Sequence, residues 1–133
     1  MSGRGADGTL AGLRVLVVED EMLIALLIED VLVEMGCVVV GPVSGLEEAL
    51  RLARDVAIPI SIAFLDVTIR GGLVFPVADA LMARNVPFIL ASGYGAWALP
   101  EHLRALPRLS KPFSRPDLEA QVRALAARVG TDG

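Results

Sequence analysis

The stretch Leu13-Arg14-Val15-Leu16-Val17-Val18-Glu19-Asp20 is a short apolar run that ends in two acidic residues. The same pattern recurs where residues 60–65 run into Asp66 and where residues 87–91 run into Ser92. Runs of this length and composition predict buried β-strands. If the strands are parallel neighbours, their carboxyl ends meet at one edge of a sheet, where open α/β sheets bind ligands.

The whole chain alternates between strand-like and helix-like patterns. Strand-like segments are separated by four helix-like segments, and a fifth helix-like segment follows the last strand, near residue 110. Right-handed crossovers turn this alternation into an α/β fold with a doubly wound, five-stranded parallel sheet of order 2-1-3-4-5, the flavodoxin-like (βα)5 arrangement. In that order the first and third strands are adjacent, which places Glu19, Asp20 and Asp66 side by side, with Ser92 and Lys111 on the other flank.

Length and composition fit one domain. We expect a flexible tail over residues 1–11, the domain over residues 12–129 and a short tail over residues 130–133. The formal charge of −4 argues against a nucleic-acid partner, because no basic stripe is present to neutralise phosphates. The longest apolar run, residues 22–28, is too short to cross a membrane, and the N-terminus has no signal-peptide pattern, so we expect a cytoplasmic protein without membrane insertion.

Local signals predict where several helices begin and which faces they bury. Residues 44–47 and residues 114–117 each have the form of a capping box, which marks a helix start. Residues 68–72 are expected to form a loop. In the helix-like segment 21–35, helical spacing predicts a core face that consists of Ile24, Leu27, Ile28, Val31 and Met35.

Three neighbouring carboxylates need a compensating cation. At an effective dielectric constant near 20, each close pair costs about 4 kcal/mol at about 4 Å. Oxygen ligands suit a hard divalent ion, and Mg²⁺ accepts one or two carboxylates together with phosphate oxygens. Lys111, the only lysine in the chain, would add a positive charge on the far side. This arrangement would let Asp66 act as a nucleophile towards phosphorus.

At four places the sequence resembles the CheY-like receiver domains of response regulators. The resemblance covers roughly residues 12–129 and rests on the short motifs 17–21 (Val-Val-Glu-Asp-Glu), 64–67 (Phe-Leu-Asp-Val), 90–93 (Leu-Ala-Ser-Gly) and 110–113 (Ser-Lys-Pro-Phe). Each motif alone is weak, but the four occur in the family's order and at its separations. The resemblance implies a single-domain response regulator of a two-component phosphorelay.

The family resemblance assigns a role to each residue of the cluster. It implies that Asp66 accepts a phosphoryl group from a histidine kinase or histidine phosphotransferase, and that Glu19, Asp20, Asp66 and the backbone carbonyl of Thr68 hold Mg²⁺. Ser92 would be the hydroxyl switch. Lys111 would contact the phosphate, with a cis peptide bond to the proline that follows. Such a protein is a phosphoacceptor switch that assists its own phosphorylation and dephosphorylation rather than an enzyme.

One position departs from the family pattern. Receivers usually have an aromatic switch residue three positions before the lysine, and here that residue is Arg108. The segment 90–94 instead resembles the stand-alone receivers known as the FAT GUY subgroup, which lack that aromatic residue. We also expect Thr68 and Tyr94, each two residues beyond a cluster residue, to shield the acyl phosphate from water. How switching works with Arg108 in place of the aromatic residue stays open.

Helix 21–35 has a second apolar stripe opposite its core face. Met22, Leu26 and Val33 lie on this stripe, and exposed apolar patches often mark a partner site. We hypothesise that the stripe receives the helical histidine domain of a kinase or phosphotransferase. The alternative is a helix packed beneath a loop. The downstream partner is unknown.

Each cluster residue also has a purely structural interpretation. Glu19 and Asp20 could favour the start of the next helix, Asp66 and Ser92 could form turns, and Lys111 could be a surface charge. Two other functions stay open as well. One is an aspartyl phosphatase of the haloacid dehalogenase type, although that family places its nucleophile first in the chain. The other is a degenerate receiver that only binds partners.

Overall fold

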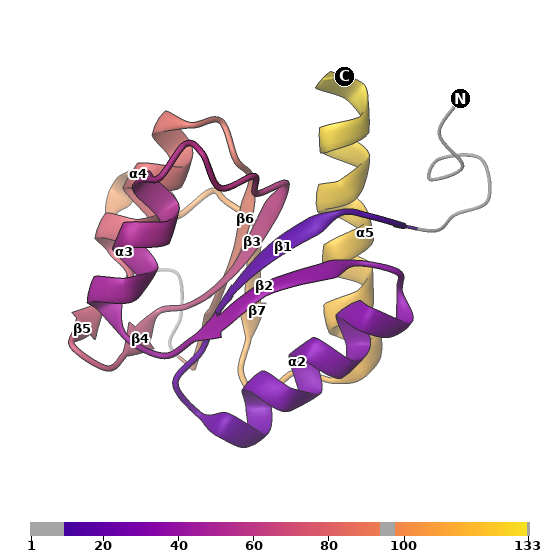
Figure 1. Ribbon diagram of the computed structural model, residues 1–133. Coiled ribbons are helices and arrows are strands. Elements are labelled where there is room, and N and C mark those ends of the chain that lie inside the picture. The colour runs from indigo at the N-terminus through magenta and orange to yellow at the C-terminus, as the bar shows by residue number, and fades with distance from the viewer. Residues whose placement is uncertain (1–9, 94–97, 133) are drawn as a thin grey trace.

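The computed structural model describes residues 10–93 and 98–132. Its centre is a parallel five-stranded sheet, in which β1 lies next to β3 and the other strands extend the sheet on either side (Figure 1). The order across the sheet is β2 (Val38–Val43), β1 (Arg14–Val18), β3 (Ile62–Asp66), β6 (Phe88–Ser92) and β7 (Arg108–Ser110). The predicted order 2-1-3-4-5 is therefore confirmed.

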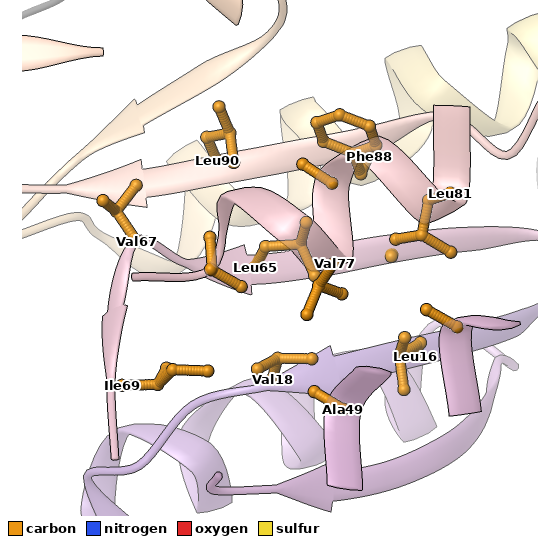
Figure 2. Close-up of a cluster of buried hydrophobic side chains, with 14 of the residues drawn as sticks. Leu16, Val18, Ala49, Leu65, Val67, Ile69, Val77, Leu81, Phe88 and Leu90 are labelled. Carbon is orange, nitrogen blue, oxygen red and sulfur yellow. The ribbon is translucent and has the colours of Figure 1, made fainter. Parts of the chain in front are cut away.

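Helices cover both faces of the sheet. On one face lie α2 (Met22–Glu34) and α5 (Arg115–Asp132), and on the other lie α3 (Leu46–Arg54) and α4 (Phe75–Ala83) (Figure 1). Successive strand residues point to opposite faces of the sheet. Because almost every residue of β1, β3 and β6 is buried, both faces of these central strands are covered. The core on the α3 and α4 side includes Leu16, Val18 and Leu65 of the central strands, which face Ala49, Val77 and Leu81 of the two helices (Figure 2).

The connection between β6 and β7 holds little regular helix in the described residues. It contains a short 3₁₀ helix, η2 (Glu101–Leu103), whose Leu103 is fully buried. Tyr94, which we expected to shield the site, lies outside the described residues. Among the described residues, no helix has the length and apolar character needed to span a bilayer.

The expected loop after Asp66 contains a small antiparallel hairpin, formed by β4 (Thr68–Ile69) and β5 (Gly72–Leu73). The predicted capping box at residues 44–47 is wrong, because this hairpin caps α3 instead. The N-cap of α3 is Gly45, with no side-chain cap, and the Leu46 amide donates to the Arg70 carbonyl at 2.9 Å. A backbone carbonyl from the hairpin therefore takes the place of the serine side chain at this helix start.

The second predicted capping box is confirmed at the start of α5. The Asp117 amide donates to Ser114 Oγ at 3.2 Å, and the Ser114 amide donates to Asp117 Oδ2 at 3.1 Å. The helix continues to Asp132, and residues 130–132 are therefore helical, whereas a tail was expected. Backbone hydrogen bonding can continue a helix beyond its last core contact. At the other end Leu10 is buried and its amide donates to the Met35 carbonyl, so the ordered chain begins before residue 12.

The rotation of α2 differs in part from the prediction. Ile28, Val31 and Met35 are buried as expected, but Leu27 is 39 % exposed, and Ala25 and Leu32 complete the buried face. The helix is apolar on nearly every side, so the sequence offers no polar face that would fix its rotation.

Arg84 joins α4 to the end of α3. Its guanidinium donates to the carbonyls of Ala53 at 2.9 Å and Ile58 at 2.8 Å, and a longer contact of 3.5 Å reaches Leu52. Carbonyls at a helix C-terminus have no partner within the helix, and a cation that binds them is favourable. Arg84 therefore links the two helices on this face of the sheet.

We expect Arg84→Ala to lower the free energy of unfolding by about 1–3 kcal/mol, because partly buried carbonyls lose charged donors. Urea unfolding measures this change. Arg54→Ala is the matched control, since Arg54 is an exposed arginine at the same end of α3. Equal stability of the two variants would contradict the role given to Arg84.

Candidate functional site

The predicted site residues all come from the carboxyl edge of the sheet. Glu19 follows β1 directly, Asp66 ends β3, Ser92 ends β6, and Lys111 follows β7. The strands are paired in the register that this requires, with Val18 opposite Leu65, Asp66 opposite Ala91 and Ser92 opposite Ser110. The structure therefore brings the residues from four separate parts of the sequence to one end of the sheet.

A single ammonium group contacts two buried carboxylates. Lys111 Nζ lies 3.0 Å from Asp66 Oδ2 and 3.5 Å from Glu19 Oε1. Glu19 is only 2 % exposed and Asp66 only 5 %. The Lys111 backbone amide donates to the Ser92 carbonyl at 2.9 Å, which fixes the start of the lysine loop against β6. One positive charge in this contact set faces two negative charges.

The carboxylates fit a divalent cation. One oxygen from each of Glu19, Asp20 and Asp66 lies within 4.8 Å of the others. Within the described part of the chain Glu19 Oε1 is buried without a hydrogen-bond partner, since the Lys111 contact at 3.5 Å is an ion pair rather than a hydrogen bond. Asp20 is exposed, which leaves the cluster open to solvent on one side. An all-oxygen set with an unsatisfied buried oxygen suits Mg²⁺.

Burial and neighbouring charges together shift the pKa values of Glu19 and Lys111. The pKa of Glu19 is raised to about 7, chiefly by burial and also by the charge of Asp66, and against the opposing effects of the Glu21 amide, which donates to Oε2 at 3.1 Å, and of the Lys111 charge. Burial alone would lower the pKa of Lys111, but the hydrogen bond and charge of Asp66, together with Glu19, raise the pKa above its ordinary value. Lys111 is therefore charged, and the Glu19 carboxyl group is partly protonated near neutral pH.

Thr68 and Ser92 lie beside one apolar cavity next to the cluster. Thr68 is exposed at the start of β4, and Ser92 is buried. The cavity between them is otherwise lined by apolar side chains from the residue between β3 and β4, from β5, from α4 and from the segment before η2, namely Val67, Leu73, Phe75, Ala98 and Leu99. Arg108, at the position where the resemblance implies an aromatic residue, is half-buried on β7 opposite Leu90.

Phe113 is a supporting residue to which sequence reasoning gave no role. Its ring packs edge to face on Phe64 of β3, with ring centroids 5.8 Å apart and an interplanar angle of 61°. Phe64 lies two residues before Asp66, and Phe113 lies two residues after Lys111. The aromatic pair therefore holds the lysine loop against the strand that positions the carboxylate. The peptide bond between Lys111 and Pro112 is cis, as the resemblance implied.

Comparisons with solved structures identify the class of this fold. A CheY-like response regulator receiver domain from Methanospirillum hungatei JF-1 matches with a TM-score of 0.79 and 18% identity, over 92% of this chain and 100% of that one. SdrG from Sphingomonas melonis Fr1 matches with a TM-score of 0.73 and 38% identity, over 86% and 96% of the two chains. The BeF3-activated conformation of SdrG from Pseudomonas melonis Fr1 matches with a TM-score of 0.69 and 38% identity, over 88% and 99%.

No protein-family model and no curated protein matches the sequence. The structural matches nevertheless point to the same family as the four motifs. The chain belongs to the CheY-like receiver domains of response regulators. Structural neighbours that are receiver domains of response regulators support a two-component receiver role.

The raised pKa of Glu19 has a consequence for stability. The pKa of this carboxyl group is higher in the folded protein than in the unfolded chain, so its protonated form favours folding. This contribution to stability is complete at a pH below the unfolded pKa and is lost as the pH rises through about 7. Glu19→Gln removes the buried charge, while its amide oxygen can still accept from the Glu21 amide. In metal-free buffer we expect this variant to gain about 1–3 kcal/mol over the native protein at about pH 8, and less at about pH 5. Urea unfolding at both pH values measures the gain, and an equal gain at both would contradict the assignment.

Proposed function

We propose that this receiver is a stand-alone response regulator whose Asp66 accepts a phosphoryl group from the phosphohistidine of a histidine kinase or histidine phosphotransferase. The single observation that supports this most is the 3.0 Å contact between Asp66 Oδ2 and Lys111 Nζ, beside the carboxylates of Glu19 and Asp20. A further support is that SdrG, 38% identical to this chain, has been solved in a BeF3-activated conformation.

The proposed reaction is an in-line displacement at phosphorus. An Asp66 carboxylate oxygen attacks the phosphorus atom, the P–N bond to the donor imidazole breaks, and the imidazole leaves as it takes up a proton. Lys111 contacts a phosphoryl oxygen and stabilises the negative charge there. When bound by Glu19, Asp20, Asp66 and the Thr68 carbonyl, Mg²⁺ supplies positive charge at the phosphoryl oxygens. The product is an aspartyl phosphate.

The switch that follows differs from the one usual in the family. We propose that the Ser92 hydroxyl bonds to the phosphoryl group, as the FAT GUY resemblance implies, and that no aromatic residue on β7 moves with it. Arg108 occupies that position and is half-buried. The output is then a changed protein contact or onward transfer of the phosphoryl group, and the chain acts in the cytoplasm as a phosphoacceptor switch rather than as an enzyme.

The donor docks, in this proposal, on the apolar surface of α2. Met22 is 73 % exposed, Leu26 is 53 % exposed and Val33 is 60 % exposed, so the stripe lies on the surface rather than beneath a loop. The helix begins three residues after Glu19, which puts its N-terminal end at the edge of the sheet where the cluster lies. A donor helix on this surface would bring its phosphohistidine towards Asp66.

Labelling with a small phosphodonor tests the acceptor directly. We expect native protein to gain the mass of one phosphoryl group from acetyl phosphate and Mg²⁺, and Asp66→Asn to gain none, because the attacking carboxylate is lost. Asp79→Asn, which changes an exposed aspartate on α4, is the control and should label normally. Steady turnover without a lasting adduct would favour a phosphatase, and no reaction of the native protein would favour a receiver that only binds partners.

The docking surface is tested by Leu26→Asp. A buried carboxylate in an apolar contact is costly, so we expect transfer from a kinase that phosphorylates the native protein to slow by about tenfold or more. Labelling by acetyl phosphate should not change, since that donor needs no docking surface. Equal loss of both activities would mean that the substitution damages the fold or the acceptor site.

A further inference from the structure

Another cavity lies at the amino edge of the sheet, at the opposite end of β6 from Ser92. We call it the amino-edge cavity; its volume is about 260 Å³, and it is lined by the end of α4, the start of β6, the segment before β7 and the C-terminal half of α5. Its described lining residues include none of the residues proposed above for phosphoryl transfer. A binding site here would therefore not depend on the acceptor role of Asp66.

The cavity combines buried apolar side chains with an exposed polar rim. Val86 and Phe88 line it and are buried, and Leu106 is half-buried beside them. Asn85 and Arg128 also line it, and both are exposed. Small-molecule sites in proteins are mostly apolar, with a few polar groups that fix the orientation of the ligand. The lining of the amino-edge cavity has this composition.

Backbone hydrogen bonds hold the walls of the cavity in place. The amides of Val86 and Asn85 donate to carbonyls in the last turn of α4, at 2.9 and 3.0 Å, in the pattern of a Schellman motif. Asn85 has a φ of 59°, the left-handed conformation that this motif requires. On the opposite wall, the Leu90 amide donates to the Pro107 carbonyl at 3.1 Å. Because both walls are attached to regular structure, a ligand would not have to order them.

The cavity lies in a basic part of an acidic chain. The formal charge of the whole chain is −4, yet residues 80–116 contain four arginines and one lysine and only one acidic residue, Glu101. Residues 120–131 of α5, among them Arg128, contain no acidic residue. Positive charge of this kind favours an anion, and a planar guanidinium can donate two parallel hydrogen bonds to one carboxylate.

We propose that the amino-edge cavity binds a small amphipathic carboxylate, a molecule with an apolar body and one carboxylate group. The apolar body packs on Val86, Phe88 and Leu106. The carboxylate accepts hydrogen bonds from the Arg128 guanidinium and from the Asn85 side-chain amide. Pockets for drug-sized ligands have volumes of about 300–1,000 Å³, so the ligand here is smaller, with a single ring or a short aliphatic chain as its apolar body.

Titration of the full chain with matched probes, followed by the NMR signals of the backbone amides, tests this proposal. Benzoate has both features of the ligand, benzamide lacks the charge, and acetate lacks the apolar body. With benzoate at millimolar concentration we expect saturable shifts of the Asn85, Val86 and Phe88 amides. Benzamide and acetate should bind about tenfold or more weakly, because each lacks one of the two kinds of contact.

Two substitutions separate ligand binding from the fold. Arg128→Gln removes the cation and should weaken benzoate binding about tenfold or more. Asn85→Gly removes the side-chain amide and should weaken binding to a smaller extent, while the turn persists because glycine adopts positive φ freely. Arg123→Gln is the matched control and should bind benzoate as the native protein does, since Arg123 is an exposed arginine of α5 outside the lining of the cavity.

Several results would overturn the inference. They are equal affinity for benzoate and either other probe, equal benzoate affinity of Arg128→Gln and Arg123→Gln, and shifts that grow without saturating. Shifts of the same amides that depend on protein concentration without any probe would show that a second copy of the chain covers the cavity, and would overturn it too. Loss of acetyl phosphate labelling in the native protein would instead overturn the proposed function and leave this inference intact.

Discussion

Two buried carboxylates that share one ammonium group are the constraint on which this molecule depends. Asp66 and Glu19 are almost fully enclosed, and Lys111 is the cation in contact with both. Buried charge is costly unless it is paired and hydrogen-bonded, and here one pairing charge is missing. Burial chiefly raises the pKa of Glu19, and the charge of Asp66 adds to this rise. One Glu19 oxygen also has no hydrogen-bond partner in the described part of the chain. A divalent cation and an incoming phosphoryl group would together complete the balance.

The fold holds this imbalance in place with contacts that lie outside the cluster. Phe113 packs on Phe64, so the loop that carries Lys111 is fixed to the strand that carries Asp66. The Ser114 and Asp117 capping box then starts α5 directly after that loop. At the opposite flank, the β4 and β5 hairpin caps α3 through Arg70. The segments on both sides of the acceptor are thus attached to regular structure, which keeps like charges close together.

The strand order and the site could be predicted because both follow from local patterns. Apolar runs that end in polar residues place Glu19, Asp66 and Ser92 at one sheet edge once the strands are known to be parallel. The cap of α3 could not be predicted, since its acceptor is the Arg70 carbonyl, far along the chain, and leaves no signal near residue 45. The rotation of α2 was partly wrong at Leu27, because a helix with apolar residues on most sides fits several rotations equally well.

The central claim is that the buried carboxylates form one site for a divalent cation, and calorimetric titration of metal-free protein with Mg²⁺ tests it most directly. The account predicts one ion bound per chain and a marked loss of affinity in Asp20→Asn, which removes an exposed ligand without disturbing the buried pair. Asp79→Asn should bind as the native protein does. Absence of Mg²⁺ binding by the native protein, or equal affinity in Asp20→Asn, would contradict the account.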